Sequence, residues 1–127
     1  MNEAIESVTR SALGLALDAA SLRQQAFAAN IANANVGDYQ TRRVSFESQL
    51  DDARRGLAQN GRLDAASLSQ VRPHLELATD ASGAAQPVQL DAQAVEMARN
   101  AVHYQALVKG LTKHFSILSM AASDGKK

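Results

Sequence analysis

The feature that most constrains the fold is an apolar repeat at each end of the chain, in which apolar residues recur at alternating spacings of three and four. This spacing puts them on one face of an α-helix and is typical of helices that pair in coiled coils. We therefore expect an all-α fold, in which helices over residues 1–35 and 91–120 pair as a coiled-coil hairpin. The expected seam consists of Ile5, Val8, Leu15, Leu22, Met97, Tyr104, Val108, Leu111, Phe115 and Leu118.

Further features sit at the edges of these two helices. Leu13, Leu17, Phe27 and Ile31 widen the first repeat to a second face, and a helix that is apolar on more than one side usually contacts more than one neighbour. Asp91 is a candidate N-cap for the second helix. We expect residues 121–127 to form a tail.

Length and composition favour a thin helical protein over an enzyme with a deep pocket. The 127 residues allow one domain, and we treat residues 1–127 as a single unit. Aromatic residues make up only 4% of the chain, and much of its apolar content is alanine. Small side chains let helix axes approach closely but build little core.

Charge and cysteine content argue against several classes of protein. Thirteen basic and thirteen acidic residues leave no net charge, whereas nucleic-acid binders usually show a basic face and membrane-surface helices a Lys/Arg-rich one. The chain holds no cysteine, which excludes disulfides and thiolate metal sites. The best N-terminal apolar run stops at Asp18 without an early basic cluster, so we expect neither a cleaved signal peptide nor a transmembrane segment.

The middle segment, residues 36–90, differs in kind from both ends. It holds the breakers Asn60-Gly61, Pro73, Ser82-Gly83 and Pro87. Residues 44–50 could form a short amphipathic element, and weak alternation over residues 74–79 predicts a short strand. A connection of this length is unusual inside a compact domain. We therefore expect an irregular, partly extended segment, with residues 56–90 partly disordered in the isolated chain or ordered by partners.

An asparagine motif ends the first helix. Asn30 and Asn33 lie three residues apart, on neighbouring positions of one helical face. Asparagine in an apolar seam lowers stability but fixes helix register. The pattern allows two interpretations: an ordinary helix end, stopped by left-handed backbone at Asn35 or Gly37, or hydrogen bonds made to a neighbouring subunit.

The sequence around this motif resembles the N-terminal signature of the flagellar axial proteins, the family of rod, hook and hook-associated proteins. Residues 29–34 read Ala-Asn-Ile-Ala-Asn-Ala and are followed by a turn and Tyr39. The resemblance assigns Asn30, Ile31, Asn33 and Tyr39 to the family motif. The chain departs from the family at residues 36–38, where Val-Gly-Asp stands in place of the usual Thr-Pro-Gly.

The C-terminal stretch narrows the resemblance to the rod branch of this family. Residues 95–107, then Leu111 and residues 113–115, are similar to the C-terminus of proximal rod proteins. The larger relatives carry β-rich insertions for which this chain has no room. The resemblance implies a non-enzymatic, self-assembling subunit of the basal-body rod, the drive shaft that transmits torque, with no cofactor, metal or small-molecule substrate.

The same resemblance implies partners and a location. The partners would be further copies of the chain, other flagellar rod proteins, and membrane-ring and export-gate proteins at the rod base, with no nucleic acid. The chain would leave the cytoplasm through the flagellar type III apparatus without signal cleavage and lie in the periplasm-spanning rod. Under this interpretation we expect Asn30 and Asn33 to hydrogen-bond across subunits.

Two other classes of function fit parts of the sequence. A soluble two-helix adaptor or export chaperone of the cytoplasm would use the same helices but would fold alone. A phosphotransfer bundle would phosphorylate His103, yet the Lys109-Gly110 pair lies too far along the helix to share its face. A metal site is disfavoured because His103 and His114 are eleven residues apart, whereas metal-binding pairs on helices sit at i, i+3 or i+4.

Overall fold

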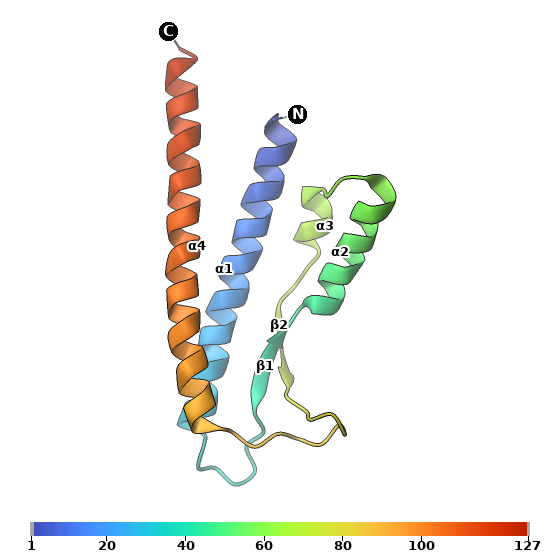
Figure 1. Cartoon of the computed structure of the whole chain (residues 1–127), viewed down its shortest axis with the longest axis vertical. Helices are drawn as coiled ribbons and strands as arrows, with labels where there is room; N and C mark the ends of the chain where they lie inside the picture. The colour runs from blue at the N-terminus through green and yellow to red at the C-terminus, as the bar shows by residue number, and fades with distance from the viewer. Residues whose placement is uncertain (1, 127) are drawn as a thin grey trace.

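The computed structural model describes residues 2–126, which are mostly helical (Figure 1). The long helices at the two ends are confirmed as α1, Asn2–Ala32, and α4, Leu90–Asp124. Between them lie β1, Arg42–Ser45, α2, Glu47–Asn60, α3, Ala65–Ser69, and β2, His74–Leu77. Residues 121–124 continue α4, so the expectation that they belong to a tail is wrong.

The molecule is arranged around α1 (Figure 1). Helix α4 runs antiparallel along one side of α1. Helix α3 and the two-stranded antiparallel sheet of β1 and β2 pack against another side. At a rise of about 1.5 Å per residue, α1 is about 46 Å long and α4 about 52 Å. The two chain ends therefore lie at the same end of the molecule. The second apolar face of the N-terminal repeat is explained by this second set of neighbours.

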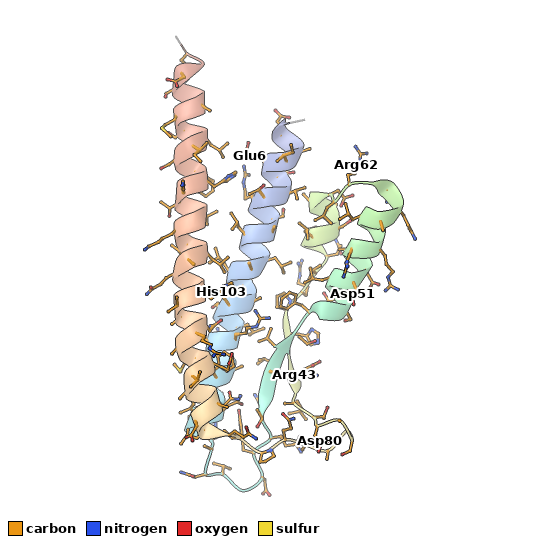
Figure 2. All side chains as sticks on the ribbon, in the orientation of Figure 1. Glu6, Arg43, Asp51, Arg62, Asp80 and His103 are labelled. Carbon is orange, nitrogen blue, oxygen red and sulfur yellow. The ribbon has the colours of Figure 1, made fainter. Side chains whose placement is uncertain are left out.

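The middle segment is more ordered than its breakers suggest. Strands β1 and β2 form an antiparallel pair in which Val44 lies opposite Leu75, and Val44 is buried. On the other face of this two-stranded sheet, Arg43 Nε donates to Glu76 Oε1 at 2.7 Å (Figure 2 labels Arg43). The strand predicted over residues 74–79 is confirmed over 74–77, whereas the irregular path predicted for residues 36–90 is wrong over α2 and α3.

Helix ends inside the middle segment follow ordinary capping chemistry. Gly61 ends α2 in the left-handed region at φ 69° and donates its N–H to Leu57 O, a conformation that glycine adopts without steric cost. Asp64 caps α3, accepting from the backbone N–H of Ser67 at 2.6 Å. These caps explain why two short helices form in a segment that is rich in breakers.

Two expectations about the ends of the long helices are wrong. Helix α4 is preceded by Gln89 as N-cap, without a side-chain bond, and Asp91 lies in the first turn, where its charge still suits the helix dipole. Helix α1 ends in a series of turns in which Tyr39 N–H donates to Val36 O at 3.1 Å. Across residues 2–126, positive φ occurs at Gly61 and Gly83 alone, so neither Asn35 nor Gly37 supplies a left-handed stop.

The buried apolar core is thin and rich in alanine. The buried apolar residues on α1 are all alanines, and larger ones come from β1, α3 and the segment that follows α3. They are Ala19, Ala20, Ala26, Val44, Ala53, Leu68, Val71 and Ala78. Small side chains on α1 let its neighbours approach closely, but they bury little apolar area per residue. Polar contacts between elements therefore carry more of the fold's specificity than in a thick core.

Candidate functional site

The hydrogen bonds of the motif converge on one buried side chain, Asn30, near the end of α1. Asn30 is fully buried, at 0% exposure. Its Nδ2 donates to Arg42 O and to Gln93 Oε1, each at 2.8 Å. Its Oδ1 accepts from Arg42 N–H at 2.9 Å and from Tyr39 O–H at 2.8 Å. A single amide thus joins α1, the turn after it, β1 and α4, and we call this set of residues the Asn30 junction.

The Asn30 junction uses the whole hydrogen-bonding capacity of the side chain. An asparagine amide has two N–H donors and two acceptor lone pairs, and each has a partner inside the chain. In the free chain the Asn30 side chain therefore fixes the geometry of this chain. The expectation that Asn30 and Asn33 hydrogen-bond across subunits concerns contacts with other copies and stays a prediction.

The other motif residues have different surroundings. Asn33 Nδ2 donates to Ala29 O at 2.8 Å, a carbonyl that also accepts the Asn33 backbone N–H at 3.1 Å, so this side chain bonds locally at the end of α1. The Tyr39 ring lies under the Arg42 guanidinium, 5.9 Å from its carbon to the ring centroid, within cation–π range. Ile31 is half-buried. The structure therefore brings Asn30 and Tyr39 together and leaves Asn33 in a local role.

A second amide junction joins α1 and α4 further along. Asn100 is 7% exposed, and its Nδ2 donates to Ala20 O at 2.8 Å and to Gln24 Oε1 at 2.9 Å. Ala20 is fully buried, which allows the close approach that the Asn100–Ala20 bond needs. The Asn100 junction and the Asn30 junction join α1 to α4 at two places about two turns apart on α4, so together they set the register of the two helices.

Two asparagines in the sequence could have identified these junctions. Asn30 and Asn100 interrupt otherwise alanine-rich helices, and buried asparagine is a known way to fix register. The partners Gln93 and Gln24 carry no such signal, because glutamine on a helix usually points to solvent. Sequence reasoning therefore found Asn30 and missed Asn100, Gln24, Gln93 and Arg42 as site residues.

The shielded face of α4 is rotated by about one residue from the expected seam. Its members recur at spacings of four and three and include three polar side chains: Gln93, Met97, Asn100, Leu107, Leu111, His114 and Leu118. Of the expected α4 seam, Met97, Leu111 and Leu118 lie on this face. Tyr104, Val108 and Phe115 are 41%, 40% and 47% exposed, so they do not form a buried intrachain seam.

The residues of the expected seam on α1 do not all face α4. Val8, Leu15 and Leu22 are half-buried and Ile5 is 64% exposed, but Ile5 and Val8 lie beside Leu63 and not beside α4. The α1–α4 contact is instead made around the two amide junctions. A regular coiled-coil hairpin along the whole length is not confirmed.

The hollows and titratable side chains of residues 2–126 are the remaining places where a ligand site could form. A hollow of about 300 Å³ beside the Asn100 junction contains no carboxylate, histidine or lysine among its lining residues. Within residues 2–126, no three His, Cys, Asp or Glu side chains are grouped to hold a metal ion. His103 is exposed on α4 (Figure 2). No helix in this range is long and apolar enough to cross a membrane.

Two long antiparallel terminal helices, joined by buried amides and flanked by a small two-stranded sheet, define the architecture of the chain. No protein-family model matches the chain. Over 122 residues it is 27% identical to "Flagellar basal body rod protein FlgB" of Bacillus subtilis (strain 168). The match covers 87% of this chain and 90% of that protein. The chain is therefore similar to a flagellar rod protein, at modest identity, over nearly the whole length of both.

Proposed function

We propose that this chain is a structural subunit of the bacterial flagellar basal-body rod, similar in role to FlgB. The observation that carries the proposal is the similarity to that rod protein over nearly all of both chains. The fold supports it, because two long terminal helices with few large buried side chains leave apolar surface for other subunits.

The finer parts of the proposal concern assembly. Copies of the chain pack with one another and with other rod proteins, and the rod base meets membrane-ring and export-gate proteins. The chain passes through the flagellar type III apparatus without signal cleavage and then transmits torque as part of the periplasm-spanning rod. The motif residues Asn30, Ile31, Asn33 and Tyr39 act by fixing the shape of the subunit, and assembly uses the apolar surface around them.

The test is to isolate flagellar basal bodies from cells that express the tagged chain and to measure its amount by mass spectrometry. The proposal expects co-purification with rod proteins, and it expects non-motile cells when the gene is deleted. Copies found only in the cytosol, in cells that swim normally without the gene, would favour an adaptor or chaperone instead.

A further inference from the structure

We propose that the outer edge of β2 docks onto the same edge of a second copy of this chain, so that two free chains pair through one continuous sheet. The outer edge is the side of residues 75–79 that faces away from β1, and we call it the β2 edge. This contact goes beyond the proposed rod function and does not depend on it. It concerns the chain before the chain joins any larger assembly.

The β2 edge carries outward main-chain groups. In an antiparallel pair, the N–H and C=O of successive residues point alternately toward the partner strand and away from it. Arg42 N–H donates to Asn30 Oδ1, and Arg42 O accepts from Asn30 Nδ2, so these groups of Arg42 point away from β2. Leu77 lies opposite Arg42, and its own N–H and C=O therefore point away from β1. The same alternation turns Leu75 outward.

Thr79 extends this open edge by one position. It forms an isolated bridge with Ala85, and the hydrogen bonds on either side of this bridge belong to residues 78 and 80. Thr79 therefore points to the same side as Leu75 and Leu77. Within residues 2–126, no hydrogen bond joins these three outward-facing residues to another segment. The β2 edge is thus a row of unpaired N–H and C=O groups at strand spacing, which fits an extended strand.

The β2 edge is exposed and unprotected. Helix α1 packs mainly on β1 and less on β2, and Leu75, Leu77 and Thr79 are exposed. Natural proteins usually protect such an edge with lysine, proline or a bulge, because an exposed apolar edge pairs with other chains. Residues 75–79 contain neither lysine nor proline, and their one charged side chain, Glu76, is paired with Arg43.

A second copy supplies a strand that matches the β2 edge. Two such edges pair antiparallel only where outward residues meet outward residues. In one register Leu77 meets the second copy's Leu77 and Leu75 meets its Thr79, so each outward residue has a partner. Apolar and β-branched side chains then lie opposite each other, which is favourable in a sheet. Because both chains use the same surface, the contact closes at two chains.

The charges along β2 favour this register over its neighbours. It places Glu76 opposite Ala78, and it places His74 opposite Asp80, a pair that attracts when the imidazole is protonated. A slide by two residues in one direction would place Glu76 opposite Glu76, and a slide in the other direction would place it opposite Asp80. Like charges directly opposite each other are destabilising. A second copy therefore carries the complementary pattern of charges for this edge.

The helices leave room for the pairing. The two-fold axis of an antiparallel pair is perpendicular to the sheet, so both copies of α1 lie over the same face. Each α1 packs mainly on its own β1, and the two β1 strands would be about 14 Å apart, with both β2 strands between them. Packed helices need only about 8–10 Å. Leu75 and Leu77 share a face with buried Val44 and would lie between the two copies of α1.

The first test uses the wild-type chain. A contact along one short strand is weak, so we expect sedimentation equilibrium to show the average mass rising from one chain toward two between about 10 μM and about 1 mM. The Leu75, Leu77 and Thr79 amides should exchange more slowly with solvent over the same range. A mass that stays at one chain, with exchange independent of concentration, would overturn the pairing and leave the rod proposal standing.

Cysteine variants test the register. The chain has no cysteine, and Leu77→Cys places two thiols at the two-fold axis. The Cα atoms of such a pair are about 5.5 Å apart, which is within disulfide range. In Leu75→Cys the two thiols are about 14 Å apart. We expect mild oxidation to link Leu77→Cys chains about tenfold faster than Leu75→Cys chains. Equal rates, or faster linkage of Leu75→Cys, would contradict the register.

A charge at the axis tests the docking surface itself. In Leu77→Lys, two lysines would oppose each other at the centre of the contact, and the rise of average mass with concentration should disappear. Leu57→Lys is the matched control, because Leu57 is an exposed leucine on α2, outside the β2 edge. It should pair as the wild type does. Equal behaviour of the two lysine variants would overturn the β2 edge as the site of pairing.

Discussion

At the scale of single residues, Asn30 is the side chain whose loss should matter most. In the Asn30→Ala variant, the Arg42 backbone, Tyr39 O–H and Gln93 all lose a partner. Unsatisfied buried polar groups cost about 1–3 kcal/mol each, less where water can enter. We expect the free energy of unfolding to fall by about 2–4 kcal/mol, measured by urea denaturation.

The control for this variant is Asn35→Ala, because Asn35 is exposed in the turn after α1. It should change stability by less than about 0.5 kcal/mol.

Tyr39→Phe removes only the bond to Asn30 Oδ1 and should cost about 0.5–1.5 kcal/mol. In the Asn30→Ala background the same change should cost much less, because the two residues share one interaction. Strict additivity would show that Tyr39 acts independently of the Asn30 junction.

Asp80 gives a pH-dependent prediction at the same scale. The Ser82 hydroxyl donates to Asp80 Oδ1 at 2.6 Å, and the Ala84 and Ser82 N–H groups donate to the same oxygen. The Ser82 hydroxyl first, and then these N–H groups, lower the pKa of the Asp80 carboxyl. A lowered folded-state pKa contributes stability above the unfolded-state pKa, and this stability is lost as pH falls through the folded-state pKa.

The measurement is the NMR shift of the Ala84 amide between pH 7 and pH 2. We expect it to change with a midpoint below that of an ordinary aspartate, and we expect amide exchange in residues 80–84 to speed up in acid relative to the rest of the chain. Asp80→Asn keeps an acceptor oxygen but has no titrating charge, so this transition should disappear. A midpoint at the ordinary aspartate value would contradict the hydrogen-bonded turn.

At the scale of elements, neighbouring residues on α4 distinguish the expected seam from the observed face. Leu107 is half-buried and Val108 is 40% exposed. Leu107→Asn should lower the free energy of unfolding by about 1–3 kcal/mol, because a large apolar side chain leaves the contact with α1. Val108→Asn should change it by less than about 0.5 kcal/mol. Both are measured by thermal or urea unfolding. A larger loss for Val108→Asn than for Leu107→Asn would support the seam that the repeat predicts.

The sequence could predict the long helices but not which face α4 turns to α1. Helices follow from local spacing, and both repeats were long enough to be unambiguous. On α4, however, nearly every turn offers an apolar residue on each side. Asn100 and Gln93 determine which face of α4 packs on α1, because their side chains hydrogen-bond to groups on α1. A pattern that counts only apolar residues therefore predicts a seam on α4 that is displaced by about one residue from the observed face.

The middle segment was less predictable for a different reason. Breakers such as Asn60-Gly61 predict where elements stop, and Gly61 does end α2. They do not predict that α2 and α3 form between the stops, because a helix of five residues such as α3 depends on packing against α1 rather than on propensity. The β1–β2 register likewise depends on the Asn30 junction and on burial of Val44, which are contacts between distant parts of the chain.

At the scale of the whole molecule, the distribution of contacts predicts a gradient of stability. The α1–α4 bonds of both amide junctions and the buried alanines of α1 lie within residues 19–30 and 93–100, whereas Ile5, Ile117 and Met120 near the chain ends are exposed. Local opening is easiest where few apolar groups are buried. We expect fast amide exchange before residue 10 and after residue 114, and slow exchange around Asn30 and Asn100. Uniform protection in the free chain would contradict this account.

The most direct test of the central claim is a density map of isolated basal bodies from cells that express this chain. The account predicts copies of the chain in the rod, each with α1 and α4 antiparallel and in the register set by Asn30 with Gln93 and Asn100 with Ala20. The exposed apolar side chains of α4 should contact a neighbouring subunit. A rod in which no density fits this helix pair, or basal bodies that lack the chain altogether, would contradict it.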